Sequence, residues 1–433
     1  MPTTAQGIAD FGSGYEKIIQ SYIQDNIPEQ IKLFKVMKTN DNVTKMNNAF
    51  YVSLRSGRSG GVQTLANDKS KLNTGGAPLS QGSITPTYQA AVFDISDPVI
   101  KSSSSSLQAL TSELEFQTKS VVKDFLKNIN RQMFSDGVGI VGMVSESGGS
   151  AGTNLLQIQY PDANASTNDT RATAYYGTTG GGINGDIMPA KYFAPGQIIG
   201  IGSAGANVGT IINSGTAVQQ GTQYGTLALT AALPSAAAGS MTVSILDGDA
   251  DASGTSEIQG FRSALSEGTQ NYMGLSRNTY TWQPQYAGTA SLQSISIPSM
   301  EQIYQSALEY AMPGDRYVWF CNKSLYNRIG DLLTALRKTV NKTELVSGWS
   351  GYSFEAGEGN VPIYRDYDCP DGELMLINVD TWTVCEMAPM GFLQDGNLLR
   401  RVDYITYQKV FSWYMNMACR APAANGRMVQ QTR

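Results

Sequence analysis

The hydrophobic pattern at the start of the chain predicts two extended elements rather than a compact core. Apolar residues recur at three- to four-residue spacing over residues 15–27, which is typical of an amphipathic helix, and Pro28 ends that pattern. Residues 49–92 begin and end with extended sequence around a polar centre, which predicts a hairpin. Strands of about 20 residues would reach about 65 Å, so we expect this hairpin to project beyond its own domain.

The clearest helical pattern lies at residues 103–135. Apolar side chains recur at three- to four-residue spacing from Leu107 to Met133, with Thr118 as a polar interruption. Gly137 is placed to close the helix. A helix of about 30 residues is a rod of about 45 Å, which we interpret as a spine lying across a sheet.

The middle of the chain has a different pattern. Residues 136–260 carry 2 basic and 9 acidic residues, a net charge of −7, and are rich in glycine. Short apolar stretches between these glycines predict β-strands. The predicted strands are Gln197–Ile201, Gly209–Ile212, Thr226–Thr230 and Met241–Leu246. We expect a small β domain inserted into a larger one and facing solvent.

Residues 261–433 mix helical and strand patterns, so that the whole chain is expected to be α+β. Helices are predicted where apolar residues follow a period near 3.6, and strands where apolar residues run together or alternate. The predicted elements are, in chain order, Met300–Ala311, Tyr317–Asn322, Ser324–Lys338, Val361–Tyr364, Leu374–Val379, Leu398–Thr406 and Val410–Met417.

Composition narrows the functions that the chain can perform. Its 433 residues suggest two or three domains, and its formal net charge of −5 gives no strongly basic surface for tight nucleic-acid binding. Only 15% of the residues are charged, against about 25% in average soluble proteins. Such a chain either has a surface rich in neutral polar groups or buries wide surfaces against partners.

Histidine is absent from the sequence. Its absence excludes Ser-His-Asp and Cys-His catalysis, imidazole acid–base chemistry and histidine-containing metal sites. The cysteines form no Cys-x-x-Cys pair, and we expect them to be buried, reduced thiols. They are Cys321, Cys369, Cys385 and Cys419.

Three short motifs match catalytic or cofactor patterns without the context that those patterns need. Residues 200–205 match G-x-G-x-x-G, but no helix start or suitably spaced acid follows, so a β-turn is expected. Residues 57–61 match G-x-S-x-G in a chain that has no histidine base. Residues 120–123 match S-x-x-K inside the long predicted helix.

Two acidic clusters complete the candidate chemistry. Residues Asp247–Asp251 resemble the start of a calcium loop, but Ala252 and Ile258 occupy the positions that need glycine and glutamate. We expect an incidental acidic turn, with a weak cation site as the alternative. The second cluster consists of Asp366, Asp368, Asp371 and Glu373. A solvated turn is expected there, with a glycosidase-type carboxylate pair as the alternative. We predict no catalytic residue, cofactor or metal.

The order of these elements resembles the major capsid proteins of tailed double-stranded DNA bacteriophages, whose fold is shared with encapsulins. The sequence phrases that carry the resemblance are Pro313–Trp319, Val361–Tyr364, Leu374–Asn378 and Tyr414–Arg427. The resemblance implies the following parts: an N-terminal arm at 1–48, an extended loop (E-loop) at 49–92, a peripheral (P) domain with the spine helix at 93–139 and 401–433, and an axial (A) domain at 261–400. The Gly-rich β domain at 140–260 would be an addition to this fold.

The resemblance also implies a function and partners. The chain would be a structural protein, not an enzyme, that self-assembles into hexamers and pentamers of an icosahedral head around packaged double-stranded DNA. Assembly in the bacterial host cytoplasm would involve a portal and a separate scaffolding protein, with a decoration protein as an option and no membrane. One alternative is an encapsulin-like compartment with an enzyme cargo. Another is a carbohydrate-binding or adhesive β protein built on the Gly-rich middle.

The expected contacts between subunits follow from charge. The hairpin carries four basic residues and a single acid, Asp68, and the spine helix offers two glutamates to a neighbouring subunit. The candidate contact residues are Arg55, Arg58, Lys69 and Lys71 in the hairpin, and Glu113 and Glu115 in the helix.

Overall fold

The computed structural model of the chain describes 25 stretches of sequence. They are residues 37–39, 43–55, 61–62, 64, 74–76, 79–96, 107–137, 139–144, 153–159, 191–193, 197–203, 206–220, 225–230, 242–245, 257–266, 271–277, 284–287, 293–335, 343–345, 349–356, 359–370, 372–393, 399–400, 406–429 and 431–432. The amphipathic helix predicted at residues 15–27 lies outside them. Among the described helices, none is long and apolar enough to cross a membrane.

The chain divides into two compact units, which we describe separately. The first unit comprises residues 1–133, 271–275 and 382–420. Its main sheet is built around β23 (Thr406–Cys419), which pairs antiparallel with β21 (Trp382–Phe392) and with β5 (Thr87–Ser96). The short strands β1 (Lys38–Thr39) and β22 (Leu399–Arg400) extend this sheet by pairing with β21 and β23.

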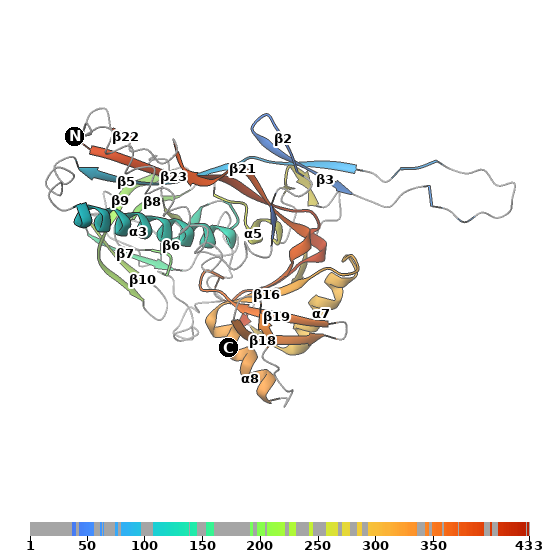
Figure 1. Ribbon diagram of the computed structural model, residues 1–433. Helices are drawn as coiled ribbons and strands as arrows, with labels where there is room; N and C mark the ends of the chain where they lie inside the picture. The colour runs from blue at the N-terminus through green and yellow to red at the C-terminus, as the bar shows by residue number, and fades with distance from the viewer. Residues whose placement is uncertain are drawn as a thin grey trace. The chain divides into compact units, whose positions relative to one another are not determined.

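The long helix α3 (Leu107–Met133) lies along this sheet (Figure 1). Its apolar side chains pack on the sheet, where the Phe125 and Phe411 rings meet edge to face with centroids 5.0 Å apart. Gln132 Nε2 also donates a hydrogen bond to Gln89 Oε1 of β5 at 3.1 Å. Thr118, the predicted polar interruption, is buried. The long helix and its packed apolar side are therefore as the spacing predicts.

A second, smaller sheet of the first unit holds the base of the predicted hairpin. The strands β2 (Val43–Met46), β3 (Ala49–Arg55) and β4 (Leu79–Ile84) pair antiparallel in that order. Beyond Ile84 the chain leaves this sheet, and β5 pairs with β23 instead. In the hairpin expected at 49–92, the two strands β3 and β4 thus pair with each other only as far as Ile84. The pair β12 (Asn271–Tyr272) and β13 (Leu275–Ser276) joins it, because Ser83 N donates to Met273 O at 3.0 Å.

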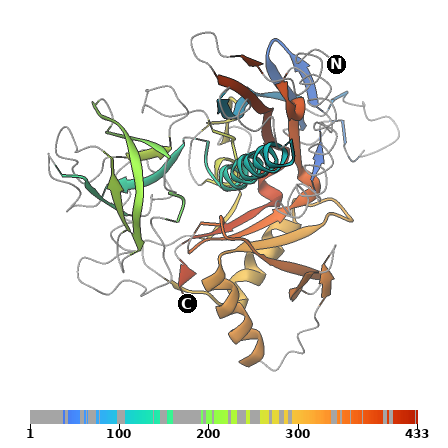
Figure 2. The same ribbon diagram turned by 60° about the vertical axis from the view of Figure 1, so that its left-hand side comes forward.

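The second unit comprises residues 134–270, 276–381 and 421–433 and contains a closed six-stranded barrel. Its strands are β6 (Ile140–Val144), β7 (Leu155–Gln159), β8 (Ile198–Ser203), β9 (Ala206–Gln220), β10 (Gly225–Leu229) and β11 (Thr242–Ile245). They close in the order β10-β7-β6-β11-β8-β9, visible in green in Figure 2. Alternate residues such as Ile199, Ile201 and Leu227 fill the interior. The G-x-G-x-x-G motif begins in β8, which pairs antiparallel with β9, so it belongs to a hairpin and precedes no helix.

A seven-stranded mixed sheet forms the rest of the second unit. Its strands are, in spatial order, β14 (Gln285–Ala287), β24 (Gly426–Met428), β20 (Leu374–Asn378), β16 (Tyr317–Cys321), β19 (Gly359–Arg365), β18 (Trp349–Ala356) and β17 (Thr343–Leu345). The helices of this part are α5 (Phe261–Ala264), α7 (Ile297–Leu308) and α8 (Lys323–Ala335), with short 3-10 turns at Val379–Thr381 and Pro422–Ala424. A further strand pair joins β15 (Gln293–Ser294) and β25 (Gln431–Thr432).

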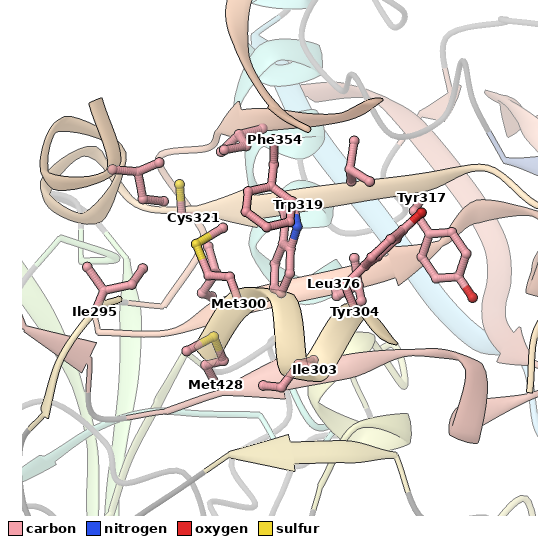
Figure 3. Close-up of a cluster of buried hydrophobic side chains, with 14 of the residues drawn as sticks. Ile295, Met300, Ile303, Tyr304, Tyr317, Trp319, Cys321, Phe354, Leu376 and Met428 are labelled. Atoms are coloured by element: carbon pink, nitrogen blue, oxygen red, sulfur yellow. The ribbon is translucent and has the colours of Figure 1, made fainter. Parts of the chain in front are cut away.

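The strand β16 is buried on both faces, which explains its uninterrupted apolar sequence. On one face Trp319 packs in a cluster with Met300 and Ile303 of α7, as Figure 3 shows. On the other face the Phe320 ring stacks on Phe261, with centroids 6.2 Å apart. A strand with both faces covered cannot alternate between apolar and polar residues.

Two features show how the end of the chain is shared between the two compact units. The strand β21, which sequence periodicity did not predict, belongs to the main sheet of the first unit. Residues 421–433, expected with the P domain, lie in the second unit, where β24 pairs with β20. The end of the chain therefore contributes β23 to the main sheet of the first unit and β24 to the seven-stranded sheet of the second.

Candidate functional site: a buried carboxylate held by two arginines

The acidic cluster around residue 370 is largely buried. Asp366, Asp368 and Glu373 are 8%, 4% and 4% exposed. The expectation of a solvated turn is therefore wrong for these three residues, while Asp371 lies outside the described residues. Their burial requires compensating partners, because an ionised carboxylate is costly to remove from water.

Glu373 is compensated by two arginines from distant parts of the chain. Its Oε1 accepts hydrogen bonds from Arg262 Nη2 at 2.8 Å and from Arg427 Nη2 at 2.7 Å. Its Oε2 accepts a third from Arg427 Nε at 3.0 Å. Arg427 thus binds the carboxylate through two parallel hydrogen bonds, the arrangement in which an arginine–carboxylate pair is strongest.

The three side chains are positioned by the seven-stranded sheet and the helix beside it. Glu373 directly precedes β20, and Arg427 lies in β24, whose register places Arg427 opposite Met375. Arg262 is in α5. Gly426, next to Arg427, is required here because a Cβ atom would collide with the Ile303 methyl group of α7.

The electrostatics of this triad favour a permanently ionised carboxylate. Burial is the largest single influence and would raise the pKa of Glu373. The charges and hydrogen bonds of Arg262 and Arg427 together outweigh it and hold the pKa of this carboxyl below its ordinary value. A general acid needs a pKa near the working pH, so Glu373 is suited to a structural role and not to proton transfer.

A buried lysine holds the same loop from the side of the barrel. Lys191 Nζ donates to Cys369 O at 2.9 Å and to Tyr367 O at 3.2 Å. Beside it, Tyr192 OH donates to Asp368 O at 2.9 Å. Lys191 Nζ also lies 4.8 Å from the centroid of the Tyr192 ring. Lys191 and Tyr192, which lie in sequence between the barrel strands β7 and β8, therefore hold the loop between β19 and β20 by hydrogen bonds.

The phrases that carried the sequence resemblance meet in a polar network next to this triad. Asn425 Oδ1 accepts from Asn378 N at 2.7 Å, and Asn425 Nδ2 donates to Ala421 O at 2.8 Å. Asn378 Nδ2 in turn donates to Asp315 Oδ2 at 2.7 Å. Three of the segments named in the sequence resemblance, Pro313–Trp319, Leu374–Asn378 and Tyr414–Arg427, are thus joined by hydrogen bonds.

An exposed ion pair lies near this network. Arg316 Nη2 and Nε donate to the two carboxylate oxygens of Asp380 at 2.9 and 3.1 Å. The Arg316 side chain is 57% exposed and that of Asp380 is 22% exposed. This pair offers a natural comparison with the buried triad.

All four cysteines are free and buried. Burial raises the pKa of Cys385 to about 12, and it also raises the pKa values of Cys321 and Cys369. A thiolate is the reactive form, so these three thiols have the inert character expected of packing residues.

The predicted contact residues fall mostly outside what the structure describes. Arg55 is the last residue of β3 and lies opposite Leu79 of β4. Glu113 and Glu115 lie in α3, but their side chains are outside the described set. Arg58, Lys69 and Lys71, like Asp247–Asp251 and residues 57–60, are also outside it. The contacts predicted for these residues remain predictions.

Comparisons with known proteins place the fold. No protein-family model and no curated protein sequence matches the chain. The cyanophage A-1(L) capsid asymmetric unit is similar in structure, with a TM-score of 0.50 and 11% identity over 93% of both chains. The capsid of the native GTA particle has a TM-score of 0.43 and 10% identity over 93% of this chain and 91% of that one. The structure of Mycobacterium phage Bobi has a TM-score of 0.40 and 7% sequence identity over 92% of this chain and 89% of that one. The first similarity shows that the chain has a phage capsid-protein fold.

Proposed function

We propose that the chain is the major capsid protein of a tailed double-stranded DNA bacteriophage, a structural protein whose copies form the hexamers and pentamers of an icosahedral head. The observation that carries the proposal is the capsid fold, matched over 93% of both chains. The low content of charged residues agrees with it, since wide subunit contacts then remove few ions from water.

The proposed parts follow the sequence resemblance. The arm at 1–48 and the E-loop at 49–92 would reach neighbouring subunits, and the P domain (93–139 and 401–433) and A domain (261–400) would form the body. The insertion at 140–260, with its net charge of −7 over residues 136–260, would face outward, because the phosphates of packaged DNA repel it. Portal, scaffolding and decoration proteins would be partners, and assembly would take place in the bacterial cytoplasm.

Electron microscopy of the purified, expressed chain tests the proposal. We expect closed shells, or hexameric and pentameric rings that close when a scaffolding protein is added. A protein that stays monomeric under all these conditions would contradict the proposal and favour a carbohydrate-binding or adhesive β protein. DNA in native particles would separate a virus head from an encapsulin-like compartment, which would hold an enzyme cargo.

The proposed E-loop contacts have their own test. Deletion of residues 56–74 should leave a soluble, folded subunit that fails to close shells. Charge reversal at Arg55 and Arg58 should act in the same direction but more weakly and in a salt-dependent way, because an exposed pair contributes about 0.2–1 kcal/mol. Normal shells from the deletion variant would show that the E-loop is not needed to hold subunits together.

A further inference from the structure

We propose that Met273 positions the hairpin sheet (β2, β3 and β4) of the first unit, and that this position is needed for the hairpin to reach a neighbouring subunit. The inference rests on the proposed function, because it names a residue that sets the direction of the proposed E-loop. Met273 lies far from the hairpin in sequence. It is in the turn that joins β12 to β13, and it contacts β4 at the base of the hairpin.

The backbone of this turn is unusual for the residue that it contains. The paired strands β12 and β13 are joined by Met273 and Gly274, whose φ angles are 53° and 75°. Two successive left-handed residues are typical of a type I′ turn, which favours asparagine and glycine. The turn between β2 and β3 follows that preference with Asn47 and Asn48, at φ angles of 50° and 57°. A methionine is disfavoured in this conformation, so contacts outside the turn must hold Met273 there.

The side chain of Met273 fills a gap in the hairpin sheet, and it is only 4% exposed. The gap lies at Gly82 of β4, where a Cβ atom would lie 3.0 Å from Met273 Cβ and 3.1 Å from Leu54 Cδ1. A glycine inside a strand often marks such a close approach. While Met273 is in place, β4 therefore has no room for a side chain at residue 82.

Two hydrogen bonds connect the same turn to both sheets of the first unit. Ser83 N, next to Gly82, donates to Met273 O at 3.0 Å, which joins the turn to β4. Cys419 N, at the end of β23, donates to Tyr272 OH at 2.9 Å, and Tyr272 is 2% exposed. The turn therefore lies between the hairpin sheet and the main sheet and is attached to each of them.

Two other contacts join the hairpin sheet to the main sheet, and both lie at the end of the hairpin sheet where β3 begins and β4 ends. Asn416 Nδ2 donates to Thr85 O at 2.7 Å, just after β4. Asn48 Nδ2, just before β3, donates to Tyr88 OH at 2.7 Å. The contact of Met273 with Gly82 lies further along β4, so it opposes rotation of the hairpin sheet about that end.

A small rotation at this base moves the projecting part of the hairpin by a large distance. The strand β3 has seven residues and is about 20 Å long, so a rotation of about 10° displaces its far end by about 3–4 Å. The same rotation would displace the tip of the predicted hairpin, about 65 Å away, by about 11 Å. Hydrogen bonds tolerate only tenths of an ångström. Direct contacts with a neighbouring subunit therefore depend on the angle at the base.

A pair of nitroxide spin labels on the full-length chain measures this angle as a distance. Labels at Ser53→Cys in β3 and Ala90→Cys in β5, both exposed positions, report on the hairpin sheet and the main sheet. The four native cysteines are buried, so they stay unlabelled in the folded protein. We expect one narrow distance distribution for the unassembled wild type. Met273→Ala should shift or broaden it by about 3 Å or more, the displacement calculated for a rotation of about 10°.

Three further variants separate the position of the hairpin from general effects on stability. Met273→Leu nearly keeps the volume that fills the gap and should keep the wild-type distance. Gly82→Ala places a methyl group against Met273, so it should change the distance as Met273→Ala does. Val122→Ala shortens a buried side chain of α3 instead, and it should lower the melting temperature without changing the distance.

Amide hydrogen exchange of the wild type gives a measurement that needs no variant. The Ser83 N–H group is hydrogen-bonded to Met273 O, so it should exchange as slowly as the amides of the paired strands β3 and β4. Fast exchange at Ser83 would overturn the inference even if Met273→Ala does not fold.

Electron microscopy of the same samples connects the distance to assembly. Met273→Ala should lose the ability to close shells, whereas Met273→Leu should keep it. The inference is wrong if the distance is unchanged in both Met273→Ala and Gly82→Ala, or if Val122→Ala changes it equally. A wild-type yield of shells from a variant with an altered distance would also contradict it. Absence of shells and rings in the wild type would refute the capsid proposal, while the distances would still decide whether Met273 positions the hairpin.

Discussion

Replacement of Glu373 by glutamine should destabilise the second unit strongly. The substitution removes the charge that compensates Arg262 and Arg427, both less than 10% exposed, and places an amide NH₂ group where the carboxylate accepted three hydrogen bonds. Removing one member of a buried ion cluster costs about 3–5 kcal/mol. At about 2–4 °C per kcal/mol for a domain of 150–250 residues, the melting temperature should fall by about 6–20 °C.

Urea unfolding of the unassembled subunit measures the effect, with Asp380→Asn as the matched control. That control removes the same charge from the exposed pair with Arg316, so it should cost no more than about 1 kcal/mol. The pKa of Glu373 is lowered in the folded protein, so its contribution is fully present above the unfolded-state pKa and is lost as pH falls through the folded pKa. The difference in the free energy of unfolding between the wild type and Glu373→Gln should therefore become smaller at acid pH. Equal costs for the two variants at neutral pH would refute the reasoning.

Three further outcomes are expected. Gly426→Ala should destabilise the subunit by about 1–3 kcal/mol in thermal unfolding, because its new methyl group meets Ile303; an unchanged melting temperature would contradict the packing. Lys191→Met removes two hydrogen bonds from a charged donor to the loop at 366–370 and should raise amide exchange there, while an unaltered exchange pattern would mean that Lys191 does not hold the loop. Cys385 should resist thiol reagents at pH 8 until the protein unfolds, and fast labelling of the native protein would show that its pKa is not raised.

The elements with a clear period were predictable from the sequence. The helices α3, α7 and α8 bury residues at helical spacing, and β16 and β20 are short apolar runs. The strand β21 escaped because its second half contains Pro389 and lies in an irregular register with β23. The end of the hairpin was missed for another reason. Local sequence marks β5 as extended but does not say which sheet it joins.

The buried triad could not be predicted from local sequence. Its partners are 111 and 54 residues away from Glu373, and the Pro-Asp-Gly sequence before it is typical of an exposed turn. The available signal was the position of Glu373 at the start of an apolar strand, where a solvated carboxylate is rare. Which cations reach that point depends on the pairing of β20 with β24, a property of the tertiary fold.

The pairing that closes the barrel also makes it a removable module. The first strand, β6, and the last, β11, are direct neighbours, with Ile140 opposite Ser244 and Met143 opposite Thr242. Just outside the barrel, Glu257 N donates to Gly137 O at 3.3 Å, so the two chain segments still run together there. The polypeptide thus enters and leaves the barrel at almost the same point, so a short connection can span the gap, with loss of the hydrogen bonds that Lys191 and Tyr192 give to the loop at 366–370. This is the geometry that domain insertion requires. Genetic exchange can add, trim or replace a cassette at residues 140–245, and an engineer can use the same junction to display a foreign domain.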